Sequence, residues 1–287
     1  TSLSGCYLVN LRADDGIRLF VDGIKVFDRW VNQAPTNYNN VLLPLTTNNA
    51  QVVYEYYENG GQNEVAFQNL YKIENNVLTS GTNQTFCEGS PAVQISAENL
   101  KANNLDLPSG ITTTWQWYYS NSPTNTGLLI SGATGQNYTP SGSPFNTPGT
   151  YYVYRVATVS SSNAANENNW GATNPVSCSF ESDRATIVVN PLPVVSVSTP
   201  NSSICAEEDA VFNLTGTSNA LVTYKINGGA DLSITLSGAG LATVTISNAT
   251  SNQTLTLVSV NDGTCSDSIT ETETVTVHPL PTIGSFN

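Results

Sequence analysis

The motif Val-Asn-Pro-Leu-Pro at residues 189–193 recurs as Val-His-Pro-Leu-Pro at residues 277–281. In each copy, residues that alternate between apolar and polar character precede the prolines, a pattern typical of a strand with one buried face. Two prolines within three residues fix two φ angles and remove two backbone donors, so the motif ends the strand and forms a stiff joint. A repeat of this kind predicts β-domains that follow one another along the chain.

The rest of the chain supports this architecture, because apolar residues alternate over short segments and helical periodicity is absent. Segment 82–190 has the pattern of an immunoglobulin-like sandwich, with Trp115 and Trp117 on one face of a central strand and a late strand opened by glycine and tyrosines. One of the two tryptophans is expected to fill the core. Segment 194–278 repeats the plan without tryptophan, and 279–287 is expected to be the start of a further repeat or a C-terminal extension.

The first segment, 1–78, contains a strong hairpin signal at Asp22-Gly23, between two short alternating strands. An Asp-Asp-Gly turn precedes this hairpin and places the carboxylates of Asp14 and Asp15 side by side at a loop tip. A later strand ends in a Glu-Asn-Gly-Gly turn at 58–61. Asp28, next to an arginine and a tryptophan, is interpreted as part of a structural polar cluster at a strand end.

This order of motifs, from about residue 5 to residue 71, resembles the anthrax protective-antigen-type β-sandwich, a lectin-like module also found in yeast flocculins and bacterial surface adhesins. The similarity covers only the second half of the family's usual length, so 1–78 is expected to be a partial jelly-roll module of this family. The fold class expected for the whole chain is therefore all-β, with this module followed by two immunoglobulin-like domains.

The resemblance also implies a binding site. In sugar-binding members of the family, an adjacent aspartate pair, often joined by a cis peptide bond, holds Ca²⁺, and the ion takes sugar hydroxyls. The residues carried over are Asp14, Asp15 and Asn59 as calcium ligands, and Asp14, Asp15, Glu58 and Gln62 as glycan-binding residues. The alternative is an ordinary turn, because aspartate side chains readily cap their own backbone.

The amino-acid composition argues against some classes of function and favours others. Only 11% of residues are charged, and the net charge is −13. Four lysines and five arginines cannot form the basic surface that a nucleic acid requires, whereas an acidic chain suits divalent cations. We find no run of eighteen apolar residues, so no transmembrane segment is expected. A polar, lysine-poor chain without methionine is typical of extracellular proteins.

Five cysteines occur, and the only histidine is His278, so a zinc site is not expected. Because each of the two later domains contains two cysteines, we expect the disulfides Cys87–Cys178 and Cys205–Cys265. Cys6 is expected to be a buried strand residue, free or paired outside this sequence.

The cysteine after a short strand, together with Pro-Leu-Pro at the joint, resembles the tandem repeats of very large Bacteroidetes surface adhesins, which include gliding-motility and type IX-secreted proteins. This resemblance implies a cell-surface location and O-glycosylation of Ser268 in the tripeptide Asp-Ser-Ile. The sequence has no nucleophile elbow and no phosphate-binding glycine loop, so no enzymatic activity is expected.

The leading functional hypothesis is adhesion, in which the first module binds surface glycans through Ca²⁺ and the immunoglobulin-like domains serve as a stalk. The alternative is a structural subunit that assembles with neighbouring copies into a surface fibre. In that case unpaired edges of the partial first module would accept a donor strand from 279–287 of another copy.

Overall fold

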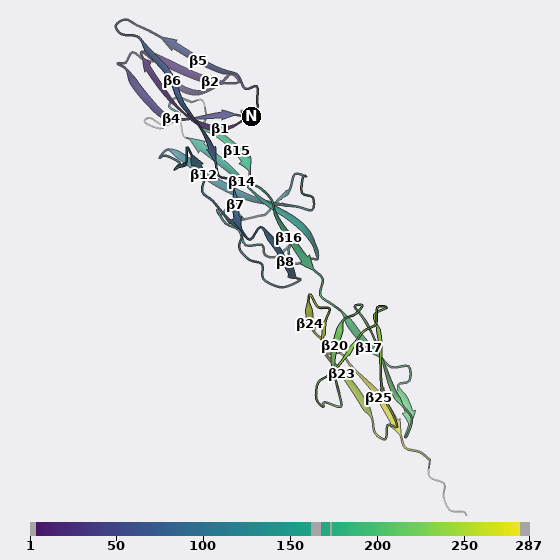
Figure 1. The fold of residues 1–287 in the computed structure, drawn as a ribbon. Coiled ribbons are helices and arrows are strands. Elements are labelled where there is room, and N and C mark those ends of the chain that lie inside the picture. Colours follow the sequence, from purple (N-terminus) through teal and green to yellow (C-terminus); the bar gives the residue numbers. More distant parts are fainter. Residues whose placement is uncertain (1–3, 162–167, 173, 282–287) are drawn as a thin grey trace, which may run out of the picture. The chain divides into compact units, whose positions relative to one another are not determined.

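The computed structural model describes residues 4–161, 168–172 and 174–281, and every regular element within them is a β-strand (Figure 1). The all-β prediction is therefore confirmed. Among the residues described, no helix could span a membrane. The chain divides into two compact units. The first comprises Thr1–Gln84, Ala92–Ser141 and Thr150–Ile187, and the second comprises Thr85–Pro91, Gly142–Gly149 and Val188–Asn287.

The N-terminal part of the first unit contains two antiparallel sheets. The larger has the order β11-β10-β6-β1-β4, and the smaller has the order β3-β2-β5. Their bounds are β1 Gly5–Asp14, β2 Gly16–Val21, β3 Ile24–Arg29, β4 Thr36–Leu45, β5 Val52–Tyr57, β6 Glu64–Glu74, β10 Lys101–Ala102 and β11 Leu105–Asp106. Two of these strands, β10 and β11, come from the segment expected to form the second domain and extend the larger sheet of the expected first module.

The turn between β2 and β3 forms at Asp22-Gly23, as the sequence predicts. Val21 pairs with Ile24, and the two turn residues have φ angles of 48° and 79°. Two consecutive positive φ angles are the mark of a type I′ turn, whose twist matches that of the flanking strands. The side chain of Asp22 also accepts a hydrogen bond from the backbone N–H of Gln51 (2.8 Å), which ties the turn to β5.

Another hairpin of the first unit contacts β1 and β4. This hairpin consists of β14 (Gly149–Ser161) and β15 (Val176–Glu181). Of its two strands, β15 lies against β1 and β4 of the larger sheet. Ala172 and Val176 are buried in the same core as Leu8 and Leu42. The N-terminal sheets are thus covered by residues that follow about 130 to 170 positions later in the sequence.

Residues 168–172, which precede β15, are joined by hydrogen bonds to strands β3 and β4 of the N-terminal sheets. The fully buried Asn169 donates from Nδ2 to the carbonyl oxygens of Val26 (2.8 Å) and Leu42 (2.9 Å), and its Oδ1 accepts from the Leu42 N–H (3.0 Å). β4 is an edge strand, and Val26 is the extra residue of a bulge in β3. The Asn169 side chain therefore bonds backbone groups that no neighbouring strand reaches.

The remainder of the first unit is arranged mainly around one six-stranded sheet, of which three strands, β8, β14 and β16, include residues assigned to the second unit. The sheet has the order β13-β12-β14-β16-β8, with β15 paired to β14, and a separate pair is formed by β7 and β9. The bounds are β7 Leu78–Ser80, β8 Asn83–Cys87, β9 Ser96–Ala97, β12 Ile111–Ser120, β13 Leu128–Leu129 and β16 Ala185–Asn190. As expected for one of the two tryptophans, Trp117 fills the core, and its Nε1 donates to the Gly135 carbonyl (2.8 Å).

Arg155 is the buried charge of this region, and its side chain is fully inaccessible to solvent. Its guanidinium donates to Asn76 Oδ1 (2.9 Å) and to the carbonyl oxygens of Gln136 (3.0 Å) and Glu98 (2.9 Å). Burial lowers the pKa of Arg155 to about 10, so the group is still a cation at neutral pH. Three oxygen acceptors from separate segments thus replace its hydration shell.

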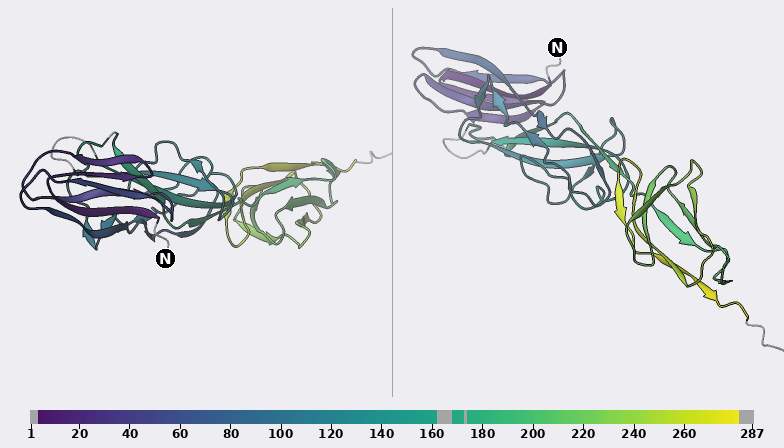
Figure 2. Two further views of the ribbon diagram at one scale, coloured as in Figure 1. Left: turned by 90° about the horizontal axis from the view of Figure 1, so that it is seen from above. Right: turned by 60° about the horizontal axis from the view of Figure 1, so that its bottom comes forward.

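The second unit contains a sandwich of two sheets (Figure 2). The sheets have the orders β17-β19-β22 and β18-β25-β23-β20-β21, and β24 pairs with β23. The bounds are β17 Val195–Ser198, β18 Ser203–Cys205, β19 Ala210–Gly216, β20 Leu221–Ile226, β21 Leu232–Thr235, β22 Leu241–Ile246, β23 Gln253–Asn261, β24 Ser266–Ser268 and β25 Thr272–His278. Alternating residues such as Phe212 and Leu214 are fully buried. β16 and β25 end at the residue before Pro-Leu-Pro, as predicted.

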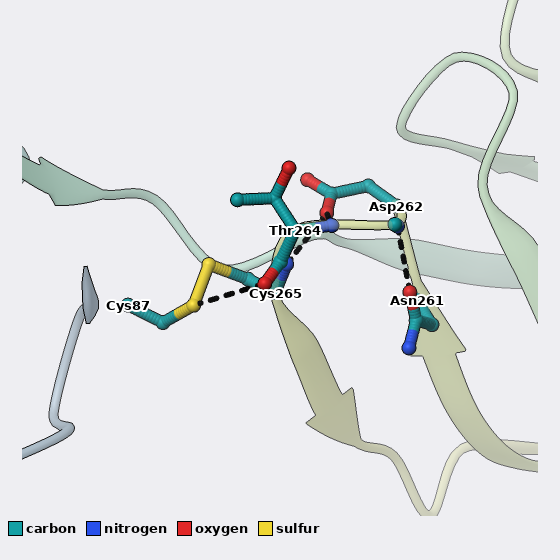
Figure 3. Close-up of a disulfide and its surroundings, with 6 residues drawn as sticks. Cys87, Asn261, Asp262, Thr264 and Cys265 are labelled. Carbon is teal, nitrogen blue, oxygen red and sulfur yellow. Dashed lines mark hydrogen bonds between the residues drawn. A yellow bond between two sulfur atoms is a disulfide. The ribbon is translucent and has the colours of Figure 1, made fainter. Parts of the chain in front are cut away.

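The predicted disulfide pairing is wrong. The bridges are Cys6–Cys178 and Cys87–Cys265, of which Figure 3 shows the second. Cys205 is free and exposed. Cys6 is therefore paired within this sequence. Cys178 lies on β15, whose contact with β1 brings it to Cys6. The error arose because each cysteine was assigned a partner within its own predicted domain, whereas both bridges join cysteines of different predicted domains.

Candidate functional site

Asp14 and Asp15 lie where β1 ends and β2 begins. The peptide bond between them is cis, as the resemblance to the protective-antigen family implied. Both residues are largely buried, with exposures of 8% and 6%. Gly16 follows directly, and a Cβ atom at this position would lie 2.0 Å from the ring of Tyr57. The Asp-Asp-Gly motif thus combines two recessed carboxylates with a glycine over which an aromatic ring packs.

Asp15 holds two loops together. Its Oδ1 accepts from the backbone N–H of Gln33 (2.7 Å), and its Oδ2 accepts from the backbone N–H of Asn59 (2.8 Å). The Gln33 side chain also donates to the Asp15 carbonyl (2.7 Å). Each carboxylate oxygen retains lone-pair capacity beyond one accepted hydrogen bond, so Asp15 can orient the loops and still coordinate a cation.

Asp14 differs from Asp15, because none of the described residues donates a hydrogen bond to its carboxylate. Burial raises the pKa of Asp14, and the negative charges of Asp15, Glu58 and Glu64 raise it further. Arg12 acts in the opposite direction, but its guanidinium is engaged by both oxygens of Glu64 (2.6 and 2.9 Å). The arrangement concentrates negative charge around the carboxylate of Asp14, which a cation would neutralise.

The loop after β5 supplies the other residues of the predicted site. Tyr56 donates from its hydroxyl to the Asp14 carbonyl (2.7 Å) and contacts Glu58 Oε2 (3.0 Å). Asn59 reaches the pair through its backbone N–H, and its side chain is exposed. Gln62 is exposed on the same loop, and no hydrogen bond to the aspartate pair is described for it.

The donors available to a metal are all oxygens, which fits Ca²⁺ better than zinc. Within the described part of the chain, no three His, Cys, Asp or Glu side chains are grouped closely enough to hold a metal ion. A calcium ion at Asp14 and Asp15 would therefore need carbonyl, amide, water or ligand hydroxyl oxygens to complete its coordination.

The sequence did not identify the aromatic residues beside this site. Trp30 is 37% exposed, and its ring centroid lies 4.6 Å from that of Tyr57, whose hydroxyl donates to Asn32 Oδ1 (2.8 Å). The guanidinium of Arg18 lies over the Trp30 ring, 4.5 Å from its centroid. Trp30 is thus a partly exposed tryptophan held by Tyr57 and Arg18, and Tyr57 in turn packs over Gly16 of the Asp-Asp-Gly motif.

A polar groove shares Gln33 with the aspartate pair. Its walls carry mainly amide and aromatic side chains, including Asn37, Tyr38, Asn40 and Trp170. Trp170 also lies against Arg29, whose guanidinium is 4.5 Å from its ring centroid. Gln33 was missed by sequence reasoning because a single glutamine in a loop carries no recognisable signal, and its role depends on contacts with Asp15.

Two further predicted residues lie elsewhere. Asp28 forms ion pairs with Lys25 (2.5 Å) and Arg18 (3.1 Å), in agreement with the interpretation as a structural cluster. Burial raises its pKa, but the hydrogen bonds from the two cations outweigh this effect and lower the pKa below the usual 3.8. Ser268 lies exposed at the end of β24, so its hydroxyl is accessible to a modifying enzyme, although its glycosylation is still only a prediction.

No protein-family model matches this sequence, and no curated protein matches it either. Among solved structures, it is similar to fibronectin(III)-like modules of Clostridium thermocellum CbhA (15% identity, 76% of this chain, 100% of that chain, TM-score 0.28). It is also similar to a structure from a 1.5-MDa bacterial ice-binding adhesin, described in connection with host cell surface retention (14% identity, 94% of this chain, 87% of that chain, TM-score 0.31). It is similar, too, to the four N-terminal Ig domains of a Dscam1 isoform (8% identity, 93% of this chain, 66% of that chain, TM-score 0.30). At such low TM-scores we draw no functional conclusion from these similarities.

Proposed function

We propose that this chain is a non-catalytic segment of an extracellular adhesion protein of the cell surface. In this proposal, the N-terminal sheets of the first unit bind glycans with the help of Ca²⁺, and the immunoglobulin-like remainder of the chain serves as a stalk. Two disulfides support an extracellular location, because such bonds persist in oxidising compartments. The resemblances to protective-antigen-type modules and to Bacteroidetes adhesins support the same location.

The observation that carries the proposal is the state of Asp14. Its carboxylate is recessed, receives no hydrogen bond from the described residues, and faces the negative charge of Asp15, Glu58 and Glu64. The negative charges around Asp14 repel one another, and a bound divalent cation would convert the repulsion into attraction. The oxygen-only donor set favours Ca²⁺, as the family resemblance implied.

The surroundings support a glycan as the ligand. The neighbouring groove offers amide groups, which hydrogen-bond hydroxyls, and Trp30 offers an exposed ring beside the carboxylates. A few placed polar groups combined with an aromatic surface are typical of sites for small polar ligands. In this arrangement sugar hydroxyls would complete the coordination of the ion, and Glu58 and Gln62 would bind from the exposed loop.

Calorimetric titration of the complete chain with CaCl₂ tests the metal. We expect one site in the wild-type protein, and loss of binding in Asp14→Asn, which keeps the shape of the side chain but removes its charge. Asp22→Asn is the matched control, because Asp22 lies in the type I′ turn, where asparagine is equally suitable. Absence of calcium binding in the wild type would refute the calcium site.

A glycan array, probed with and without a calcium chelator, tests the ligand. We expect binding that requires calcium and is lost in both Asp14→Asn and Trp30→Ala. Calcium binding without any glycan recognition would leave the ion a structural role and would reject the lectin function. The fibre alternative depends on segment 279–287, of which 282–287 lies outside the described residues; within the described residues, β4 is an edge strand of the larger sheet.

A further inference from the structure

Cys87 and Cys205 occupy equivalent positions. Each is the last residue of a short strand that is a neighbour of the strand leading into Pro-Leu-Pro, β8 next to β16 and β18 next to β25. In both cases the residue after the cysteine donates its N–H to the carbonyl of the residue before the first proline. These bonds are Glu88 to Asn190 (2.9 Å) and Ala206 to His278 (2.8 Å).

The turns that follow the two cysteines also match. The carbonyl of Cys87 accepts from the N–H three residues later (2.9 Å), and so does that of Cys205 (3.1 Å). The second residue after each cysteine has a positive φ angle, 77° at Gly89 and 75° at Glu207. Glutamate rarely adopts such a conformation, so its occurrence here reflects a backbone geometry shared by the two repeats.

Cys178 and Cys265 form a second equivalent pair, and both are bridged. Cys178 lies on β15, which pairs with β14, and Cys265 directly precedes β24, which pairs with β23. In both repeats this strand lies off the main path of its sheet. The late hairpin of each immunoglobulin-like repeat thus carries one cysteine.

The two bridges follow one rule. Each joins the late-hairpin cysteine of a repeat to a cysteine in the preceding part of the chain, with sequence separations of 172 and 178 residues. Cys87 obeys the rule through its bond to Cys265. Its equivalent, Cys205, is exposed and is the one cysteine of the five without a disulfide partner.

We propose that Cys205 forms the next bridge of this series, with a late-hairpin cysteine in a further immunoglobulin-like domain of the same polypeptide. That domain would follow the joint at Pro279-Leu280-Pro281, and its cysteine would lie at a comparable separation C-terminal to Cys205. The inference is independent of glycan binding. It rests on the repeat of strand, hydrogen bonds, turn and φ angle at Cys87, where the equivalent bond exists.

Formation of this bridge is an ordinary oxidation. The two thiols lose two protons and two electrons as the sulfur–sulfur bond forms. The acceptor is the disulfide of an extracytoplasmic thiol oxidase, which is reduced to a dithiol by exchange through a mixed disulfide. Because Cys205 is exposed, its sulfur is accessible both to the oxidase and to the incoming hairpin.

Non-reducing peptide mapping of the protein isolated from its native cells, after free thiols have been blocked, tests the proposal. We expect the Cys205 peptide to be linked to a peptide from beyond residue 287 that lies in a hairpin shortly before another proline-rich joint. Recovery of Cys205 as a blocked thiol, or linked to Cys205 of a second copy, would overturn it.

The 287-residue chain itself provides a second measurement. Without reduction, a maleimide should add once per molecule, at Cys205, and should not add to the matched variant Cys205→Ser. Addition at Cys87 or Cys265 instead would show that the series of bridges does not exist as described, and the proposal would fail with it.

Discussion

Replacement of Asn169 by alanine should destabilise the first unit strongly. The side chain is fully buried and makes three hydrogen bonds, to both backbone groups of Leu42 and to the carbonyl of Val26. Because β4 is an edge strand and Val26 is a bulge residue, no other strand can take over these groups. Each buried group left without a partner costs about 1–3 kcal/mol, and a water molecule admitted to the space recovers part of this, so we expect a loss of about 3 kcal/mol.

Urea unfolding followed by tryptophan fluorescence measures this loss selectively, because Trp30, Trp115, Trp117 and Trp170 all belong to the first unit. With a slope of about 2–3 kcal/mol per molar urea for a domain of this size, the midpoint should fall by about 1 M at unchanged slope.

The neighbouring Asn168→Ala provides the control. Asn168 donates to the carbonyl oxygens of Asn39 (3.2 Å) and Asn40 (2.9 Å) from a partly exposed position, where water can replace it. Its loss should cost about 1 kcal/mol or less. Equal midpoint shifts for the two variants would refute the view that Asn169 completes an otherwise open strand edge.

Three further outcomes are expected. Replacing both Cys6 and Cys178 by serine should destabilise the first unit by about 5 kcal/mol in the loop-entropy model, measured by the same urea titration. Asp28→Asn should lower stability at neutral pH, because the lowered pKa of Asp28 means that its ionised form stabilises the fold above pH 3.8. In urea titrations across pH, the difference in stability between the variant and the wild type should vanish as the pH falls below that value. Arg155→Lys should cost about 2 kcal/mol, measured by fluorescence, because an ammonium group cannot reach three acceptors arranged for a planar guanidinium.

The controls for these three outcomes are also available. Cys205→Ser should leave stability unchanged, because Cys205 has no disulfide to lose. A pH-independent effect of Asp28→Asn would contradict an electrostatic origin. Arg155→Lys with wild-type stability would show that the three acceptors are satisfied in another way.

Local features were predictable from the sequence, and long-range ones were not. Asp22-Gly23 determines its turn through two adjacent φ angles, and Pro-Leu-Pro ends its strands by removing donors, so both could be recognised from a few residues. The Asp-Asp-Gly motif likewise placed Asp14 and Asp15 side by side in a turn, although the sequence does not show that Asp15 accepts a hydrogen bond from Gln33.

The disulfides show the limit most clearly. Pairing Cys6 with Cys178 requires β15 to contact β1, and nothing near either cysteine encodes that contact. The packing of residues 168–181 against the N-terminal sheets also depends on long-range contacts. Asn169 lies in a polar segment, and its role is defined only by its hydrogen bonds to the backbone of Leu42. Expecting each domain to be self-contained led to the wrong pairs.

The two bridges also determine how the chain would respond to being pulled from its ends. Cys87 lies within the loop closed by Cys6–Cys178, and Cys178 lies within the loop closed by Cys87–Cys265, so the loops interlock along the sequence. Tension that enters at Cys6 passes directly to Cys178 through sulfur. Between Cys178 and Cys265 it divides over two covalent paths of similar length, one forward along the backbone and one back through Cys87. Even with every strand unfolded, the first bridge alone withholds on the order of 600 Å of extension, given its separation of 172 residues. While its sulfurs remain oxidised, the chain between Cys6 and Cys265 can therefore lengthen only along the two paths that join Cys178 to Cys265, and reduction of the first bridge would release the withheld length.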